Sequence, residues 1–102
     1  MLADRKAEDI LLLDISELSV LAEFFVICSG ASDRQLKDLQ SSVREKAKDY
    51  GKLPLNVEGE PSSGWILMDY GAVVVHIFAP EMRLFYDLED LWRNARPVVR
   101  IQ

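Results

Sequence analysis

The chain has 102 residues, of which seventeen are acidic and twelve basic, so its formal net charge is −5. Hydrophobic residues make up 49% and charged residues 28%, as in ordinary globular proteins, and the length suits one domain over residues 1–102. Nucleic-acid binding draws its affinity largely from Lys and Arg on phosphates, so this balance argues against a direct nucleic-acid site and favours a protein partner. No apolar run approaches the ~20 residues of a membrane span, so we expect no membrane association.

Two apolar runs near the N-terminus predict buried strands. Ile10–Ile15 is apolar except for one aspartate, and Phe24–Ser29 ends at Gly30. Between them, Glu17–Ala22 is predicted to form a short helical turn. The one cysteine, Cys28, lies in the second run, so we expect a buried thiol rather than a reactive one. A cysteine that cannot form an internal disulfide suits a reducing compartment, so the expected location is cytoplasmic.

A long amphipathic helix is predicted after Ser32. Ser32 and Gln35 match a capping box, in which each side chain bonds a backbone N–H at the other's position. Gly51 supplies the left-handed residue that commonly ends a helix. The apolar stripe, spaced by three or four residues as a helix requires, consists of Leu36, Leu39, Val43, Ala47 and Tyr50.

The stretch from Gly64 to Phe78 predicts a β-hairpin, because β-branched and aromatic residues flank a glycine. We expect a two-residue loop, Tyr70–Gly71, since glycine accepts the positive φ of a tight turn. This register places Trp65 opposite His76. Side chains alternate along a strand, so one face then carries Trp65, Leu67, Asp69, Val74, His76 and Phe78. Both faces of the hairpin are apolar, so the rest of the chain or a partner must cover each of them.

The remaining elements are a short edge strand, a second helix and a tail. The edge strand is predicted at Leu53–Val57, and the extended tail at Arg93–Gln102. Pro80 suits the first turn of the second helix. The apolar face of that helix is expected to carry Leu84, Leu88 and Leu91. The element order therefore predicts an α/β fold, with a sheet of about five strands and flanking helices.

The sequence offers little for catalysis. His76 is the one histidine and no His/Cys cluster accompanies it, so we expect no metal site, no cofactor and no catalytic residue. Trp65 and Asp69 have two interpretations. They are either a core tryptophan and a turn-initiating aspartate, or the apolar anchor and the charge of a protein-binding hot spot.

Seven segments, taken in order, resemble the ribosomal silencing factor family, also called the Iojap-related family. They span about residues 6 to 92 and read Lys6–Ile10, Phe25–Gly30, Ser32–Gln35, Pro54-Leu55 with Val57–Gly59, Trp65–Gly71, Val73–His76, and Phe85–Glu89 with Leu91-Trp92. The resemblance implies a mixed sheet similar to a nucleotidyltransferase core. It also implies a non-enzymatic repressor of translation, ribosome-associated in the cytoplasm and without a cofactor. Such a repressor binds the large ribosomal subunit through its protein numbered fourteen and sterically blocks joining of the small subunit.

Two other functions remain open at this point, a nucleotidyltransferase-fold enzyme and a large-subunit assembly factor. Enzymes of that fold carry a Gly-Ser pair followed by strand carboxylates that hold metal. Here the order is reversed, Ser29-Gly30, and the strand after the long helix has no carboxylate pair. The assembly factor would contact RNA, for which a basic patch is missing.

The resemblance places the partner-binding residues on the tryptophan-containing strand. We expect Trp65 to be the apolar anchor, Leu67 its packing neighbour, and Asp69 the partner of a Lys or Arg. Further candidates are Val74 and His76, which the hairpin register would bring alongside, and Glu58, for charge complementarity. The family usually has an acidic residue where this chain has Ala72, which removes one charge beside the site. A homodimer through the same face is the other use that the sequence leaves open.

Overall fold

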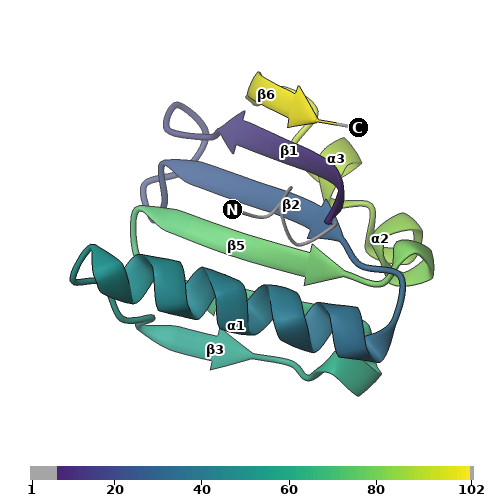
Figure 1. Ribbon diagram of the computed structural model, residues 1–102. Helices are drawn as coiled ribbons and strands as arrows, with labels where there is room; N and C mark the ends of the chain where they lie inside the picture. The colour runs from purple at the N-terminus through teal and green to yellow at the C-terminus, as the bar shows by residue number, and fades with distance from the viewer. Residues whose placement is uncertain (1–6, 102) are drawn as a thin grey trace.

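The computed structural model describes residues 7–101, which form a mixed six-stranded sheet in the order β3-β4-β5-β2-β1-β6 (Figure 1). The strands are β1 (Glu8–Asp14), β2 (Phe24–Ser29), β3 (Asn56–Glu58), β4 (Trp65–Asp69), β5 (Val73–Phe78) and β6 (Arg96–Ile101). The helices are α1 (Asp33–Asp49), α2 (Pro80–Tyr86), α3 (Leu88–Leu91) and the 3-10 helix η2 (Pro61–Ser63). Strands β2 and β5 run parallel and the other neighbouring pairs antiparallel, which confirms the predicted α/β class with a mixed sheet. Lys6, in the first family-like segment, and Gln102, in the predicted tail, lie outside the described residues.

Helix α1 packs on one face of the sheet, over β4 and β5 (Figure 1). It begins where predicted: the Ser32 hydroxyl accepts the N–H of Gln35 at 3.1 Å, and Gln35 Oε1 accepts the N–H of Ala31 at 2.7 Å. The core beneath α1 consists of Cys28, Leu36, Leu39, Val43, Ile66, Met68, Val75 and Ile77. The predicted stripe ends earlier than expected, because Tyr50 follows the helix as its C-cap and is 74% exposed.

The opposite face of the sheet has its own core, which α2, α3 and the segment after them cover at one end (Figure 1). Its buried members are Leu11, Leu13, Ile15, Ala22, Ile27, Phe78 and Ala95. Toward β4 the same face carries side chains that are only partly buried, among them Trp65, Leu67 and Val74. An apolar surface therefore reaches solvent beside this second core.

The hairpin forms as predicted, but its register differs by two residues. The N–H of Tyr70 donates to the carbonyl of Val73 at 2.9 Å, so the two-residue loop is Gly71–Ala72 and not Tyr70–Gly71. Trp65 consequently pairs with Phe78 instead of His76. Glycine at φ +87° takes the first loop position, which suits a type II′ turn. Because a shift of two preserves the alternation, the predicted faces of both strands are correct.

The second predicted helix is divided at Asp87, which adopts the left-handed conformation (φ 47°, ψ 52°). A left-handed residue interrupts the helical period, so the predicted apolar face does not form. Leu84 and Leu91 are 82% and 72% exposed, whereas Leu88 packs against the second core. Met82 packs there as well, and Arg83 is buried.

Two further segments differ from expectation. The helical turn predicted at Glu17–Ala22 forms earlier in the chain, where the carbonyl of Ile15 accepts the N–H groups of Leu18 at 2.9 Å and Ser19 at 3.0 Å, and residues 19–22 are irregular. Asp14 Oδ1 stabilises the start of this turn by accepting both the N–H and the hydroxyl of Ser16. The predicted tail becomes β6, which pairs with β1 and raises the strand number from about five to six. Ion pairs support this pairing, with Arg96 2.7 Å from Asp14 and Arg100 2.9 Å from Asp9.

Candidate partner-binding site

The six predicted site residues lie on one side of three adjacent strands. Glu58 of β3 pairs with Leu67 of β4, which pairs with His76 of β5, so these three form a row across the sheet. Asp69 and Val74 pair one step along, and Trp65 begins β4 at the other end. Paired residues of neighbouring strands point to the same face, so the structure brings all six together on the face away from α1.

Trp65 is the centre of an aromatic cluster. Its ring stacks on Phe78, with centroids 5.1 Å apart, and meets Tyr86 of α2 at 4.5 Å. Its indole N–H donates to Nδ1 of His76 at 3.2 Å. The side chain is half-buried, so one part of the ring is fixed by these contacts while another part remains exposed. Trp65 therefore packs as a core residue on one side, while its exposed side leaves the surface-anchor interpretation a prediction.

His76 lies beneath the surface and not on it, being only 3% exposed. Desolvation by burial lowers its pKa from 6.5 to about 4, so the imidazole is neutral near pH 7. Because Nδ1 accepts the indole N–H, the ring proton must be on Nε2, which is buried and has no hydrogen-bond partner among the described residues. His76 therefore orients Trp65 from beneath the surface and does not itself form part of the exposed surface.

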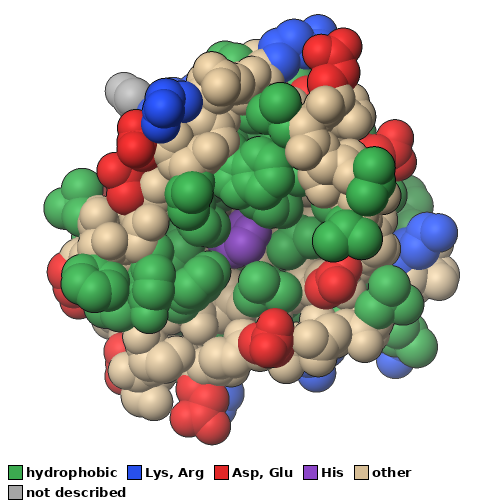
Figure 2. Space-filling view, turned by 180° about the vertical axis from the view of Figure 1, so that it is seen from behind, with side chains coloured by type: hydrophobic (Ala, Val, Ile, Leu, Met, Phe, Trp, Pro, Cys, Tyr) green, Lys and Arg blue, Asp and Glu red, His purple; other side chains and the backbone are tan. Residues whose placement is uncertain are grey.

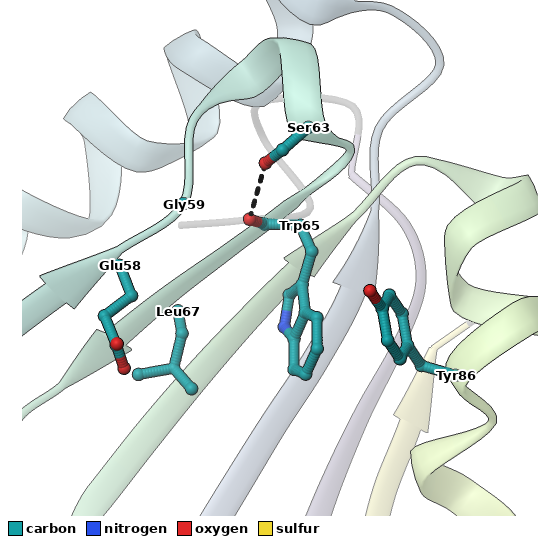
Figure 3. Close-up of a pocket in the computed structure, with 6 residues that line it drawn as sticks. All are labelled: Glu58, Gly59, Ser63, Trp65, Leu67 and Tyr86. Carbon is teal, nitrogen blue, oxygen red and sulfur yellow. Dashed lines mark hydrogen bonds between the residues drawn. The ribbon is translucent and has the colours of Figure 1, made fainter.

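A shallow hollow of about 280 Å³ opens beside Trp65, with Glu58 and Leu67 on one side of the indole and Tyr86 on the other (Figure 3). Gly59 and Ser63 complete its lining. The hollow depends on a glycine here, since a Cβ at Gly59 would lie 1.9 Å from the carbonyl oxygen of Trp65. The Ser63 hydroxyl bonds that same oxygen at 3.2 Å and fixes the start of β4.

The apolar surface extends beyond the predicted residues. Phe25 of β2 contacts His76 with ring centroids 4.7 Å apart, and Trp92, just after α3, contacts Phe25 at 5.0 Å. On the α2 side, Phe85 is 75% exposed and touches Tyr86. Figure 2 shows the single histidine surrounded by hydrophobic side chains, with acidic groups near the rim of this region. An apolar centre with charged edges is the usual composition of a protein-binding surface.

The two carboxylates at the edge of this surface, Asp69 and Glu58, differ in burial and in hydrogen bonding. Asp69 is partly buried, and its Oδ1 accepts the N–H of Gly71 at 2.8 Å, so it stabilises the turn as the core interpretation expected. Its Oδ2 accepts no hydrogen bond from the described residues, so this oxygen is available to a cation. Glu58 is exposed and lines the hollow. Both can therefore contribute charge to a contact, with Asp69 the more firmly positioned of the two.

Tyr86, Phe25 and Trp92 were not among the predicted site residues. Tyr86 was missed because it is not on the predicted apolar face of the second helix, and its contact with Trp65 depends on how α2 packs against β4. The position of Phe25 could have been found in part from the sequence. Alternation along β2 places it on the face away from α1, but the sequence did not show that β2 lies beside β5.

The described residues 7–101 contain no group of three or more His, Cys, Asp or Glu side chains that could hold a metal ion. Ser29, in the reversed Ser-Gly pair, accepts a hydrogen bond from Nη1 of Arg83 at 2.9 Å and is buried. The Cys28 thiol is buried as predicted, and desolvation raises its pKa to about 12. No helix of the described part is long and apolar enough to cross a membrane.

Comparison with known proteins identifies the family. A family model described as ribosomal silencing factor during starvation matches residues 1–102. The chain belongs to this family. A ribosomal silencing factor from Bacillus subtilis is 40% identical over 92 residues, which cover 90% of this chain and 78% of that protein. A ribosomal silencing factor from Chromobacterium violaceum is 42% identical over 96 residues, covering 94% and 79%.

Solved structures agree with this membership in the ribosomal silencing factor family. A crystal structure of a Chromobacterium violaceum protein superposes with a TM-score of 0.86 at 40% identity, covering 99% of this chain and 84% of that one. A Bacillus halodurans crystal structure gives a TM-score of 0.82 at 34% identity, covering 96% and 89%. The resemblance drawn from the seven segments is thus confirmed, and so is the mixed α/β sheet that it implied.

Proposed function

We propose that this chain represses translation by binding the large ribosomal subunit through its protein numbered fourteen and sterically blocking the small subunit from joining. The observation that carries the proposal is the partly exposed aromatic surface around Trp65, in a chain of the ribosomal silencing factor family. The surface provides the anchor that such contacts need, a large ring held in one orientation by His76 and Tyr86. The net charge of −5 favours fast association with a basic ribosomal protein in the cytoplasm.

Each predicted site residue has a role in this proposal. Trp65 and Leu67 form the apolar centre, and Val74 continues it on β5. His76 acts from below as a positioning residue, by accepting the indole N–H. Asp69 and Glu58 supply negative charge at the edge, opposite Lys or Arg of the ribosomal protein.

The first test is binding of the purified chain to the isolated large-subunit protein numbered fourteen. Trp65→Ala removes the anchor and should weaken binding by about 2 kcal/mol or more, roughly thirtyfold. Leu53→Ala is the matched control, because Leu53 is 68% exposed but lies outside the site, and it should change affinity less than twofold. Absence of binding by the wild-type chain would contradict the proposal.

A second variant distinguishes loss of binding from misfolding, because Trp65→Ala also removes packing contacts from the fold. Asp69→Asn keeps an oxygen that can accept the N–H of Gly71 but loses the charge. It should fold normally and bind severalfold more weakly at low salt, with a smaller difference at high salt. Blocking of subunit joining is then measured with purified subunits. The chain should lower the joined fraction when added before the small subunit, and Trp65→Ala should not.

Large-subunit assembly is a second candidate, favoured by one relative. A mouse protein named mitochondrial assembly of ribosomal large subunit protein 1 is 32% identical, and the chain spans 42% of its length. An assembly role would show as accumulation of large-subunit precursors in cells that lack the protein, under conditions where mature subunits join normally. The enzyme alternative would require metal-dependent nucleotide turnover by the purified chain.

A further inference from the structure

Helix α2 (Pro80–Tyr86) forms one wall of the hollow beside Trp65, through the ring of Tyr86 (Figure 3). The rest of the lining comes from β3, from β4 and from the segment between them. The centroids of the Tyr86 and Trp65 rings lie 4.5 Å apart. The width of the hollow and the packing of the half-buried tryptophan therefore depend on the position of α2 relative to the sheet.

Apolar packing and capping do little to fix the position of α2. The helix has seven residues, and helices this short are marginal in water without tertiary contacts. Ala79, at its N-cap, has no side chain that could accept a hydrogen bond. Leu84 and Phe85 are exposed, and Met82 is only partly buried. Arg83 is the one buried residue of α2, whose seven residues are all described, so a charged side chain has the place that an apolar one usually takes.

The hydrogen bonds of Arg83 connect α2 to two strands and to the next helix. Nη1 donates to the carbonyl of Asp9 in β1 at 2.7 Å and to the hydroxyl of Ser29 in β2 at 2.9 Å. Nε donates to Oε1 of Glu89 in α3 at 2.8 Å. The guanidinium is planar and its donors have fixed directions, so these bonds constrain the orientation of the side chain as well as its distance from the sheet. Arg83 therefore fixes where α2 lies.

Tyr86 follows Arg83 by three residues, so the two side chains belong to one helical turn. The N–H of Asp87 donates to the carbonyl of Arg83 at 2.9 Å and closes this turn. We propose that Arg83 is a positioning residue for the partner-binding site: its hydrogen bonds hold α2 at the sheet, and α2 in turn holds the Tyr86 ring against Trp65. The effect on partner binding rests on the proposed function, whereas the packing of Tyr86 on Trp65 does not.

The first measurement follows the NMR signal of the Trp65 indole N–H in the purified chain alone, because the neighbouring Tyr86 ring alters the magnetic field at the indole. Arg83→Met removes every donor of the side chain, so it should move this signal in the same direction as Tyr86→Ala. In a chain that already carries Tyr86→Ala, Arg83→Met should cause little further shift, since it acts through Tyr86. A role of Arg83 in stability alone would leave the signal of the folded chain unchanged in both backgrounds.

The second measurement is the affinity for the isolated large-subunit protein numbered fourteen. Tyr86→Ala should weaken binding about tenfold, as truncation of a central interface aromatic commonly does. Arg83→Met should weaken it roughly fivefold in the wild-type background and less than about twofold when Tyr86→Ala is already present, because residues that act through one contact are not additive. Arg83→Lys keeps the charge and part of the hydrogen bonding, so it should restore some of the affinity that Arg83→Met loses.

Two further variants separate positioning from misfolding. Glu89→Ala removes one acceptor of Arg83 and leaves those on the sheet, so its indole shift should have the same direction and a smaller size. Arg93→Met is the matched control, because Arg93 and its partner Asp90 are both exposed; it should leave the indole signal in place and change affinity less than about twofold. The amide signals of α1, whose core lies on the other face of the sheet, report whether each variant is folded.

The possible results test the positioning role apart from the proposed function. Arg83 is not a positioning residue if folded Arg83→Met leaves the indole signal unchanged, or if it weakens binding by the same factor with and without Tyr86→Ala. Where Arg83→Met does not fold, Glu89→Ala is judged by the same two results. If the wild-type chain does not bind the ribosomal protein but its indole signal responds to the variants as expected, the proposed function is wrong and the positioning role of Arg83 stands.

Discussion

His76 and Trp65 constrain each other at the centre of the proposed ribosome-binding surface. The neutral imidazole accepts the indole N–H, and burial under the aromatic cluster keeps it neutral. Protonation of Nδ1 would place two donors face to face and add a charge in an apolar environment, so it would both weaken the fold and release the indole. The orientation of the Trp65 indole therefore depends on the protonation state of the His76 imidazole.

This link predicts how stability depends on pH. The folded pKa of His76 is about 4 and the unfolded value about 6.5, so the unfolded chain binds a proton first as the pH falls. The contribution of His76 to the free energy of unfolding is fully present above about pH 6.5. It is lost as the pH falls to about 4, which lowers the free energy of unfolding by roughly 3 kcal/mol in total. The free energy of unfolding in urea should fall accordingly between pH 7 and pH 4.

His76→Phe is the control for that titration. It keeps an aromatic ring but cannot be protonated, so the difference between wild type and variant isolates His76 from the carboxylates that both chains share. The free energy of unfolding of the wild type minus that of His76→Phe should shrink or change sign as the pH falls. If it stays constant between pH 7 and pH 4, His76 is not the buried neutral group described here.

At the scale of single elements, the sequence correctly predicted the features that depend on interactions between neighbouring residues. The α1 helix begins at its predicted cap, and β2 has its predicted bounds, because capping and strand preference depend on neighbours in sequence. The hairpin register was wrong because Gly71 can serve as either residue of a two-residue loop, and only tertiary pairing selects the first position. The break at Asp87 was missed because a left-handed aspartate has no strong sequence signal.

The α1 cap gives a prediction at this scale. Ser32→Ala removes the acceptor of the Gln35 N–H and should destabilise the chain by about 1 kcal/mol in chemical denaturation. Ser41→Ala is the matched control, because Ser41 is exposed in the middle of the same helix, where alanine is the better helix former. Its effect should be neutral or slightly stabilising. Equal losses in the two variants would mean that the cap contributes nothing specific.

At the scale of the whole molecule, the sequence predicted the layers but not the contacts that join distant segments. Arg83 is not part of the apolar face predicted for the second helix, yet it is only 7% exposed in the fold. Its Nη1 donates to the carbonyl of Asp9 at 2.7 Å and to Ser29 at 2.9 Å, and its Nε to Glu89 at 2.8 Å. These partners lie up to 74 residues away, beyond the reach of any local pattern.

This arginine joins β1, β2, α2 and α3, and Arg100 extends the network to β6 through Asp9 and Glu89. Arg83→Met keeps much of the apolar stem but loses every donor, so Asp9 and Glu89 lose their buried cation. Because both carboxylates are partly exposed, we expect a cost near the low end for a broken buried pair, about 3 kcal/mol.

Arg93→Met is the matched control, since Arg93 and its partner Asp90 are both about two-thirds exposed, and it should cost less than about 0.5 kcal/mol. Urea denaturation measures both variants. Hydrogen exchange then locates the effect: protection should fall first in β1, β6 and α3, while α1 keeps its protection because its core lies on the other face of the sheet. Uniform loss across α1 as well would show that the two cores unfold as one unit and that Arg83 stabilises the molecule as a whole.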